Sequence, residues 1–422
     1  MQIQTASSAP PAVNRFSPNL EAVRGFAALL VVWSHAVSFP LTLDPGYTVT
    51  GFFSYLAPSH FSVLVFFVLS GYVIGLTNRR ALTAATIKDY LRKRGTRLYP
   101  IYFVCMLLAV LVGGTAAYSG RTILGNFTFL QILLTPVIAE NAPAWSLHFE
   151  VIYYLLFIPI SYLGLHPLLM MGGAFAVGML NLWLFPTNPL LSSYSFGFSF
   201  WLAGLTLAFY ADKFSYRQPS YQQLLAVLLL FVSLRGFDAP ETLLRKIVDA
   251  TVGSHLHYIG GDNFTSIISF YDYAWLPYAV ASIVLFAHKS FRYQRIFMTG
   301  LFVLPGLTWL HIYETRAALN VSLYGLSSLF YVLALLTYFI ESKWVEPVAQ
   351  AFIGVFIRVG SISYGLYIVH FPLLMLMARL DFFTGSALTF WVRFAGLLGV
   401  SFLGAYWLER KFQPWVKAHF TG

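Results

Sequence analysis

Residues 60–77 read HFSVLVFFVLSGYVIGLT, a run without Asp, Glu, Lys or Arg. A helix needs about 20 mostly apolar residues to cross the hydrocarbon layer of a bilayer, so this stretch predicts a membrane span. Similar stretches lie at 25–42, 99–118, 145–162, 167–185, 195–210, 221–236, 274–288, 296–312, 319–340, 359–378 and 388–408. The stretch 123–138 is apolar but shorter and contains Asn126, Gln131 and Pro136, so we expect a re-entrant or interfacial segment there.

The composition of the chain agrees with lipid as its solvent. Of its 422 residues, 58% are hydrophobic and only 10% are charged, and the mean hydropathy is +0.70. A soluble domain carries about 25% charged residues, so this chain has too few charges to cover the surface of a soluble fold. We therefore expect an all-α, polytopic integral membrane helix bundle with roughly 10–12 transmembrane helices.

The basic residues fall mostly on one side of these spans. With the N-terminus placed in the cytoplasm, 19 of the 26 Lys and Arg residues lie in cytoplasmic segments and 7 lie outside. This bias follows the positive-inside rule and predicts that both termini are cytoplasmic. Topology thus accounts for most of the net charge of +10, and no nucleic-acid partner is expected.

We expect one transmembrane domain over residues 20–412. Residues 1–19 are polar, rich in Ser, Ala and Pro, and unlike a signal peptide, so they predict a short disordered cytoplasmic tail. Residues 413–422 predict a second short cytoplasmic tail. The single cysteine, Cys105, lies in an apolar run and is expected to be a buried hydrophobe. No Cys or His spacing typical of a metal site is present, so no metal is expected.

Ionisable residues inside the predicted spans are few, and the bilayer makes each of them costly. Glu150 is the one carboxylate placed within a span, and His35 and His370 are two histidines placed deep in theirs. At about 1.5 Å per residue, His35 lies roughly 15 Å from the cytoplasmic start of its helix. We expect the three to meet in the middle or outer half of the membrane. They suggest acid–base chemistry, and the simpler alternative is a hydrogen bond that ties two helices together.

The densest charge cluster lies in an expected cytoplasmic loop at 78–98. Arg94 and Arg97 are three residues apart and would share one face of a helix, with Arg92 beside them. Guanidinium groups suit phosphate oxygens, so the cluster is a candidate phosphate site. Cytoplasmic anchoring or contact with anionic lipid headgroups is the alternative that charge alone leaves open.

These residues lie in a pattern that resembles the acyltransferase family 3 membrane O-acyltransferases. The opening NLEAVRGFAALLVVWSH, from Asn19 to His35, is similar to the first helix of that family, with Glu21 where the family commonly has Asp. Further matches in the family's order are FFVLSGYVIG (66–75), RGTRLYPIY (94–102), WSLHFEVIYYLL (145–156), SYGLYIVHFPLL (363–374) and a final WLER (407–410). The region 220–345 carries no motif of the family.

The resemblance implies a reaction and its substrates. An acyl group, with acetyl as the family's default, would pass from cytoplasmic acyl-CoA to a hydroxyl group. The acceptor would be a sugar, a lipid-linked or envelope glycan, or another small molecule. The expected location is the inner (plasma) membrane of a bacterium, in contact with membrane lipids.

The resemblance also suggests roles for single residues. We expect the CoA phosphates to bind Arg94, Arg97 and Arg24, with Arg92 beside them. We expect His35 to be the general base, with an acyl-His35 intermediate as an open variant. The remaining expected roles are Glu21 or Glu150 as the group that orients His35, His370 as the group that binds the acceptor or the oxyanion, and Trp145, Ser146, Ser70 and Tyr364 as structural or acceptor-binding residues.

A different class of protein fits the same deep ionisable residues. A proton-coupled transporter or flippase also carries buried histidines and a central carboxylate among about twelve spans. The sequence shows no pair of half-length helices and no twofold repeat of hydropathy, which disfavours this alternative.

Overall fold

The computed structural model describes residues 17–38, 43–257, 264–315 and 320–420. Within these residues, nine helices are long and apolar enough to cross a membrane, and there are up to ten if a bent pair is taken as one span. Two shorter apolar helical segments, at residues 221–233 and 270–286, complete the set of predicted spans. The all-α polytopic bundle is thus confirmed. The tail expected at 1–19 lies mostly outside the described residues, and α1 begins at Asn19.

The long helices and the runs of consecutive helices are α1 (Asn19–Ser38), α2 (Ser59–Thr77), α3 (Ala84–Gly113), α5 (Ala144–Tyr162), α6 (Pro167–Leu184), α7 (Leu190–Phe209), α11 (Gln294–Val303) with α12 (Leu307–Thr315), α13 (Val321–Phe339), and α16 (Ala387–Trp407) with α17 (Gln413–Phe420). The shorter helices are α4 (Gly120–Phe127), α8 (Tyr221–Ser233), α9 (Ala239–Thr251) and α10 (Leu276–Phe286). Helices α14 (Val345–Gly360) and α15 (Ser363–Met377) form the pair with a 73° bend. The strands β1 (Ser215–Tyr216) and β2 (Lys289–Ser290) pair antiparallel.

The prediction of a loop at 78–98 is wrong for most of these residues. Helix α3 begins at Ala84, after a capping box made by Thr83 and Thr86, and continues for 30 residues through Pro100. The prediction failed because it followed hydropathy, whereas Lys, Arg and Leu are good helix formers whether or not they lie in lipid. Five of the basic residues of this segment therefore lie on one helix that continues into the bundle, whereas Arg79 and Arg80 precede it.

Residues 123–138 form no spanning helix, in agreement with the expected interfacial segment. Helix α4 ends at Phe127, and Phe129 and Ile132 then adopt positive φ angles of 57° and 71°. The turn is held by Asn126, whose Nδ2 donates to the carbonyl oxygen of Pro136 at 2.8 Å.

Glycines allow two pairs of helices to pack backbone against backbone. A Cβ atom on Gly71 of α2 would lie 1.9 Å from the carbonyl oxygen of Trp201, and one on Gly204 of α7 would lie 1.8 Å from that of Val68. Small residues at such crossings let transmembrane helices approach closely. The contact between α1 and α14 has the same form, because a Cβ on Gly360 would lie 2.0 Å from the carbonyl oxygen of Glu21.

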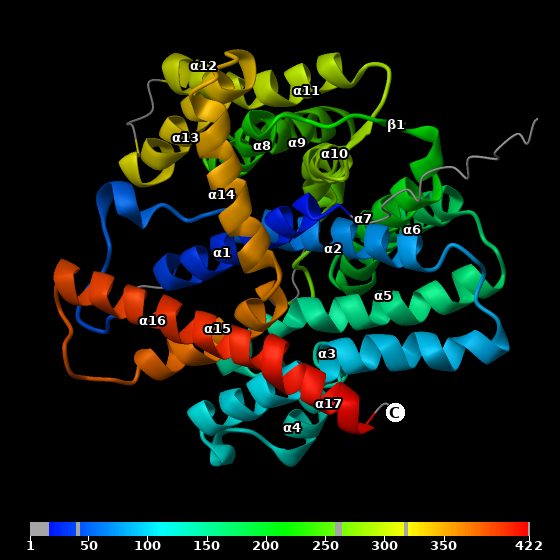
Figure 1. The fold of residues 1–422 in the computed structure, drawn as a ribbon, viewed down its shortest axis with the longest axis vertical. Helices are drawn as coiled ribbons and strands as arrows, with labels where there is room; N and C mark the ends of the chain where they lie inside the picture. The colour runs from blue at the N-terminus through cyan, green and yellow to red at the C-terminus, as the bar shows by residue number, and fades with distance from the viewer. Residues whose placement is uncertain (1–16, 39–42, 258–263, 316–319, 421–422) are drawn as a thin grey trace, which may run out of the picture.

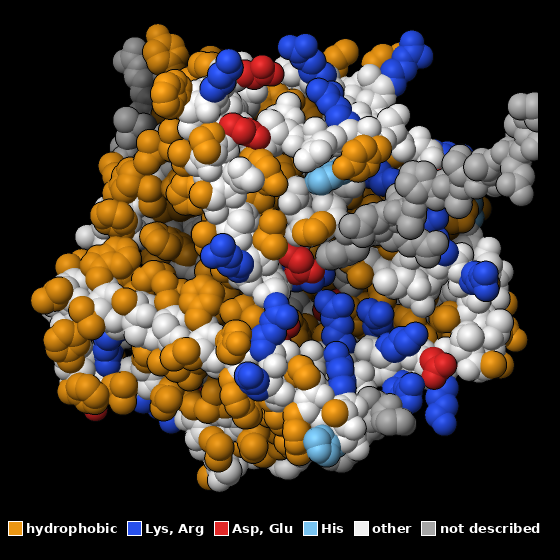
Figure 2. Space-filling model, in the orientation of Figure 1, with side chains coloured by type: hydrophobic (Ala, Val, Ile, Leu, Met, Phe, Trp, Pro, Cys, Tyr) orange, Lys and Arg blue, Asp and Glu red, His pale blue; other side chains and the backbone are white. Residues whose placement is uncertain are grey.

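Figure 1 shows how this second contact arranges the C-terminal half of the chain. Helix α14 runs steeply across α1, and after the bend α15 lies beside α16. In the same orientation, Figure 2 shows Lys and Arg side chains gathered over α3 and α17, while hydrophobic side chains dominate the opposite edge. The charge asymmetry seen in the sequence therefore appears on the surface of the fold.

The buried carboxylate of Asp44 joins the loop that follows α1 to the loop that precedes α16. One oxygen of Asp44 accepts hydrogen bonds from the backbone N–H groups of Gly46 and Gly385 at 3.0 and 2.9 Å, and the other accepts one from Oγ1 of Thr389 at 2.6 Å. Burial alone would raise the pKa of Asp44. The hydrogen bonds and the nearby Arg393 outweigh burial, and the pKa lies below its usual value.

We predict that Gly204→Ala destabilises the protein by about 1–3 kcal/mol, because the added methyl group must push α2 and α7 apart. The thermal midpoint of the purified protein in detergent measures this. Gly172→Ala on α6 is the matched control, since a Cβ there would meet nothing within 4 Å. Equal midpoints for the two variants would contradict the packing argument.

We predict that Asp44→Asn lowers the stability at neutral pH by about 1–3 kcal/mol, because the charged hydrogen-bond acceptor is lost. A carboxyl group with a lowered folded-state pKa stabilises the fold above its unfolded-state pKa. That contribution disappears as the pH falls through the folded-state value. The difference in thermal midpoint between wild type and Asp44→Asn should therefore shrink on acidification. A difference that stays constant would show that the Asp44 charge does not stabilise the fold.

Candidate active site

An open cavity of about 730 Å³ lies where α1, α2, α3, α5 and α15 meet. Apolar side chains of α2 cover one wall. The polar residues that line it are Arg24, Ser70, Arg94, Arg97, Ser146, Glu150, Tyr154, Ser363, Tyr364 and Tyr367. Most of the residues expected from the sequence to be functional are therefore gathered in one place.

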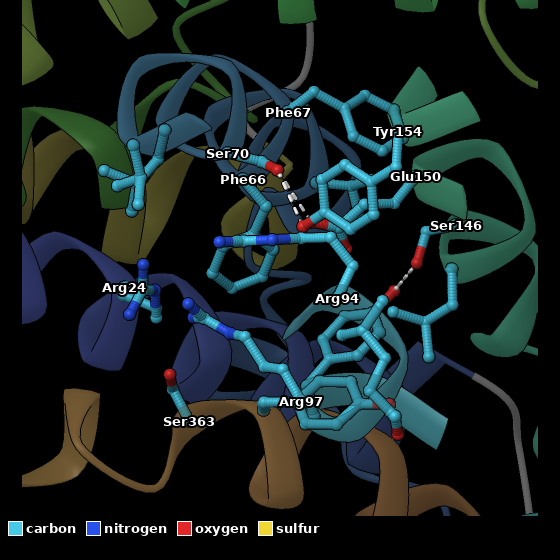
Figure 3. Close-up of a pocket in the computed structure, with 17 residues that line it drawn as sticks. Arg24, Phe66, Phe67, Ser70, Arg94, Arg97, Ser146, Glu150, Tyr154 and Ser363 are labelled. Carbon is cyan, nitrogen blue, oxygen red and sulfur yellow. Dashed lines mark hydrogen bonds between the residues drawn. The ribbon is translucent and has the colours of Figure 1, made fainter. Parts of the chain in front are cut away.

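Three guanidinium groups converge on this cavity, and Figure 3 shows their side chains pointing toward one another. Arg24 comes from α1, and its Nη1 donates to both carboxylate oxygens of Glu21 at 2.8 and 3.0 Å. Arg94 and Arg97 come from successive turns of α3, and the described residues give neither of them an ion pair. Nε of Arg94 is buried without a hydrogen-bond partner. Two converging cations that form no ion pair favour the binding of an anion.

Glu150 is held at the opposite wall of the cavity. Its Oε1 accepts hydrogen bonds from Oγ of Ser70 at 2.8 Å and from the hydroxyl of Tyr154 at 2.5 Å. The hydroxyl of Ser70 in turn accepts from the indole N–H of Trp201 at 3.3 Å. These contacts fix the carboxylate from α2, α5 and α7 and leave its second oxygen available to the cavity.

A second polar site joins α1 to α15 through two stacked imidazoles. Nδ1 of His35 lies 2.9 Å from Nε2 of His370, and the two rings are nearly parallel. Nδ1 of His370 lies 3.1 Å from the carbonyl oxygen of Leu366.

The hydrogen bonds set the proton positions on the two rings. The carbonyl of Leu366 can only accept, so Nδ1 of His370 donates the hydrogen, and in a neutral ring its Nε2 must then be an acceptor. Nδ1 of His35 therefore carries a hydrogen and donates it to His370. This places the lone pair of a neutral His35 on Nε2, for which the described residues show no hydrogen-bond partner.

The guanidinium groups and the histidines lie along shared helix faces. Arg24 and His35 are eleven residues apart on α1, which is three turns and about 16 Å on one face. On α15, Ser363, Tyr367 and His370 follow each other at helical spacing, and the first two line the cavity. Tyr367 connects the two sites, since its hydroxyl lies 2.8 Å from Oγ of Ser146 and its ring lies edge-on to that of His370.

Not every expected partnership forms. Glu21 binds Arg24 and lies about 21 Å along α1 from His35, so it does not orient the imidazole. Glu150 contacts Ser70 and Tyr154, and the described residues show no contact between it and either histidine. Both nitrogens of His370 already have partners, which leaves no N–H for an oxyanion.

Five of the expected site residues do not line the cavity, namely Glu21, His35, His370, Arg92 and Trp145. Arg92 is half exposed on α3 and lies 4.0 Å from Asp89, away from the three converging arginines. Trp145 is buried against the rings of Phe67 and Phe149 and so fits the structural role expected for it.

Two residues that were not predicted from the sequence, His148 and Glu409, make notable contacts in the structure. His148 on α5 is fully buried, with Nδ1 against the carbonyl oxygen of Phe129 and Nε2 against the hydroxyl of Tyr194. It is thus a third deep histidine in addition to His35 and His370. Its place inside the predicted span 145–162 was the available signal. Glu409 accepts the backbone N–H of Gly365 at 2.7 Å within a π-helical segment at Leu408–Phe412. Among the described residues, no group of three or more His, Cys, Asp or Glu is placed to hold a metal.

Comparison with known proteins identifies the class that this fold and site define. Residues 17–299 match the model of the acyltransferase 3 family, described as an acyltransferase domain, and this match covers more than half of the chain. The chain therefore belongs to the acyltransferase 3 family. The match includes His35, all three arginines of the cavity and Glu150, whereas His370 lies beyond it.

Two curated relatives are similar to parts of the chain. Acyltransferase MdmB from Streptomyces mycarofaciens is 29% identical over 165 residues, which are 36% of this chain and 41% of that protein. Protein 2 in picA locus from Rhizobium radiobacter is 35% identical over 91 residues, which are 21% of this chain and 41% of that protein. The chain thus spans about two fifths of the length of each relative. No solved structure matches the chain.

Proposed function

We propose that this protein transfers an acyl group, with acetyl as the default, from acyl-CoA to a hydroxyl group of an acceptor at the membrane. The observation that carries the proposal is the position of His35: its ring is held by His370, its Nε2 has no partner among the described residues, and it lies three turns along α1 from a cluster of arginines. Helix α1 thus carries the proposed general base at a fixed distance from an anion site that Arg24 of α1 forms together with Arg94 and Arg97 of α3.

The arginines suit the phosphates of the donor. Arg94 and Arg97 have no carboxylate partner among the described residues, and their forked N–H groups match phosphate oxygens. The phosphates would lie at the end of α1 where basic side chains gather, and the thioester arm would extend along α1 and α15 toward His35. The lining of the cavity itself is mostly apolar, which suits an extended acyl-carrying arm.

The chemistry follows from the proton positions. The acceptor hydroxyl gives its proton to Nε2 of His35 while its oxygen bonds to the carbonyl carbon of the thioester. The carbon–sulfur bond then breaks, and the leaving thiolate takes the proton back from Nε2. The products are an ester and free CoA. His370 accepts the hydrogen bond from Nδ1 throughout, which stabilises the imidazolium and keeps the ring in place, so His370 is a positioning residue.

The acceptor hydroxyl would belong to a sugar, a lipid-linked glycan or another small molecule. The proposed location is the plasma membrane of a bacterium, which agrees with the bacterial sources of both relatives. Mass spectrometry of envelope glycans from cells with and without the protein would identify the acceptor and the acyl group together.

We predict that His35→Gln lowers kcat by about 10²–10⁴-fold, because the general base is lost. Transfer of labelled acetyl from acetyl-CoA, measured on purified protein in detergent, tests this. His419→Gln, which changes an exposed histidine on α17, is the control. His370→Phe should lower kcat with little effect on the KM for the donor, and His370→Gln should restore part of the loss.

Wild-type turnover in the folded His35→Gln variant would exclude His35 as the base. The same assay separates an enzyme from the transporter alternative, because acyl transfer needs no sealed compartment and net transport does. Labelled protein that accumulates without acceptor, and does not form with His35→Gln, would identify the covalent acyl-histidine variant.

We predict that Arg94→Gln and Arg97→Gln each raise the KM for acyl-CoA by about 10–100-fold, because a charge-assisted hydrogen bond to phosphate is worth about 1.5–3 kcal/mol. The effect on kcat at saturating donor should be small. Lys93→Gln, an exposed cation on the same helix, should leave KM unchanged. An unchanged KM in both arginine variants would remove the phosphates from this cavity.

A further inference from the structure

A second cavity, of about 810 Å³, opens between the bend of α14 and α15 and the end of α16. Arg358 and Arg410 lie on its two sides. The rings of Phe402 and Tyr406 on α16 and the side chain of Ile362 form much of the remaining wall. We refer to it as the α14–α16 groove. It shares no lining residue with the arginine cavity, so it is a separate site.

The groove carries positive charge that the described part of the chain does not neutralise. Arg358 and Arg410 are both exposed, and neither forms an ion pair with a described carboxylate. The acidic neighbour of Arg410, Glu409, is turned away to the backbone N–H of Gly365. Two exposed guanidinium groups across a groove favour an anion that can contact both.

The surroundings of the groove indicate the depth at which this anion lies. Tyr406 and Trp407 are each about half exposed, at 51% and 52%, and aromatic rings of this kind mark the level of lipid headgroups. Toward its N-terminus, α16 carries exposed apolar side chains such as Leu403, which is 72% exposed. An occupant of the groove would therefore have a charged head between the arginines and an apolar tail along α16.

We propose that the α14–α16 groove binds the headgroup of an anionic phospholipid. The phosphate would lie between Arg358 and Arg410, and the acyl chains would follow the lipid-facing side of α16. Basic pockets between transmembrane helices on the cytoplasmic side suit such lipids, and both arginines belong to the side that the charge asymmetry assigns to the cytoplasm.

The groove is connected to the arginine cavity through one backbone contact and one hydrogen bond from a backbone N–H to a side chain. Arg358 is two residues from Gly360, which touches the backbone of Glu21, the partner of Arg24. Arg410 follows Glu409, which holds the N-terminal turn of α15, where Ser363 and Tyr364 line the cavity. A bound lipid would hold both contacts together and so favour donor binding. This second part rests on the proposed function, whereas the lipid site itself does not.

The test compares Arg358→Gln/Arg410→Gln with Arg80→Gln/Arg295→Gln, which removes two exposed arginines away from the groove. Native mass spectrometry of protein from phosphatidylcholine nanodiscs, with and without phosphatidylglycerol, measures the lipid retained. At about 1 kcal/mol per arginine, the groove variant should bind phosphatidylglycerol roughly thirtyfold more weakly, and each single variant roughly fivefold. The control pair should bind it like wild type, and Arg358→Lys/Arg410→Lys, which keeps both charges, should lie in between.

Equal retention of phosphatidylglycerol by the groove variant and the control would overturn the lipid site. Weaker acetyl-CoA binding by the groove variant in pure phosphatidylcholine, with lipid retention unchanged, would also overturn it and assign the arginines to the donor. Loss of lipid retention, with a donor KM that no longer responds to phosphatidylglycerol, would support both parts. If the groove variant loses the lipid but the wild-type protein transfers no acyl group, the lipid site is supported and the proposed function is rejected.

Discussion

The contact between Gly25 and Gly360 decides where the chemistry of this protein can take place. At this point the backbones of α1 and α14 touch. The rings of Phe26 and Phe356 lie beside the contact, edge to face, with their centroids 5.0 Å apart. The chain then bends by 73°, and α15 runs along α1. Without this approach, His370 would not reach His35, and the lining of the arginine cavity would lose its α15 wall. A substitution that adds a side chain at either glycine would act on the site from a distance, because it would move a whole helix.

Charge balance is the second constraint on the site. Three guanidinium groups line the cavity, and three carboxylates interact with them: Glu21 pairs with Arg24, Glu409 acts on Arg24 and Arg97, and Glu150 accepts two hydroxyl groups through one oxygen. Charge buried near lipid is costly unless it is paired, and these carboxylates offset part of that cost. Among the described residues, no carboxylate forms an ion pair with Arg94 or Arg97, so these two guanidinium groups remain able to bind an anion.

Much of the fold was predictable because membrane spans depend on composition and length, which sequence shows directly. The twelve predicted segments and the interfacial segment near Asn126 followed from apolar runs alone. The start of α3 did not, because hydropathy cannot distinguish a cytoplasmic helix from a loop. A capping box at Thr83 was the available sign.

The site was predictable as a set of residues but not as a set of pairs. Which side chains meet depends on how each helix is rotated about its axis, and close backbone contacts such as Gly25 with Gly360 fix that rotation. Glu21 therefore binds the arginine one turn away, and His370 supports His35 where it was expected to bind the acceptor or the oxyanion. His148 was overlooked because a histidine near the end of a predicted span looks like a surface residue.

The direction of the hydrogen bonds through the two imidazoles has a consequence for the membrane as a barrier. The chain of donors runs from His35 to His370 and stops at the carbonyl oxygen of Leu366, which has no proton to pass on. A proton that arrives at Nε2 of His35 can leave only by the way it came. The pair is thus closed at one end, so the acid–base chemistry proposed for His35 would open no route through these rings by which protons leak across the membrane.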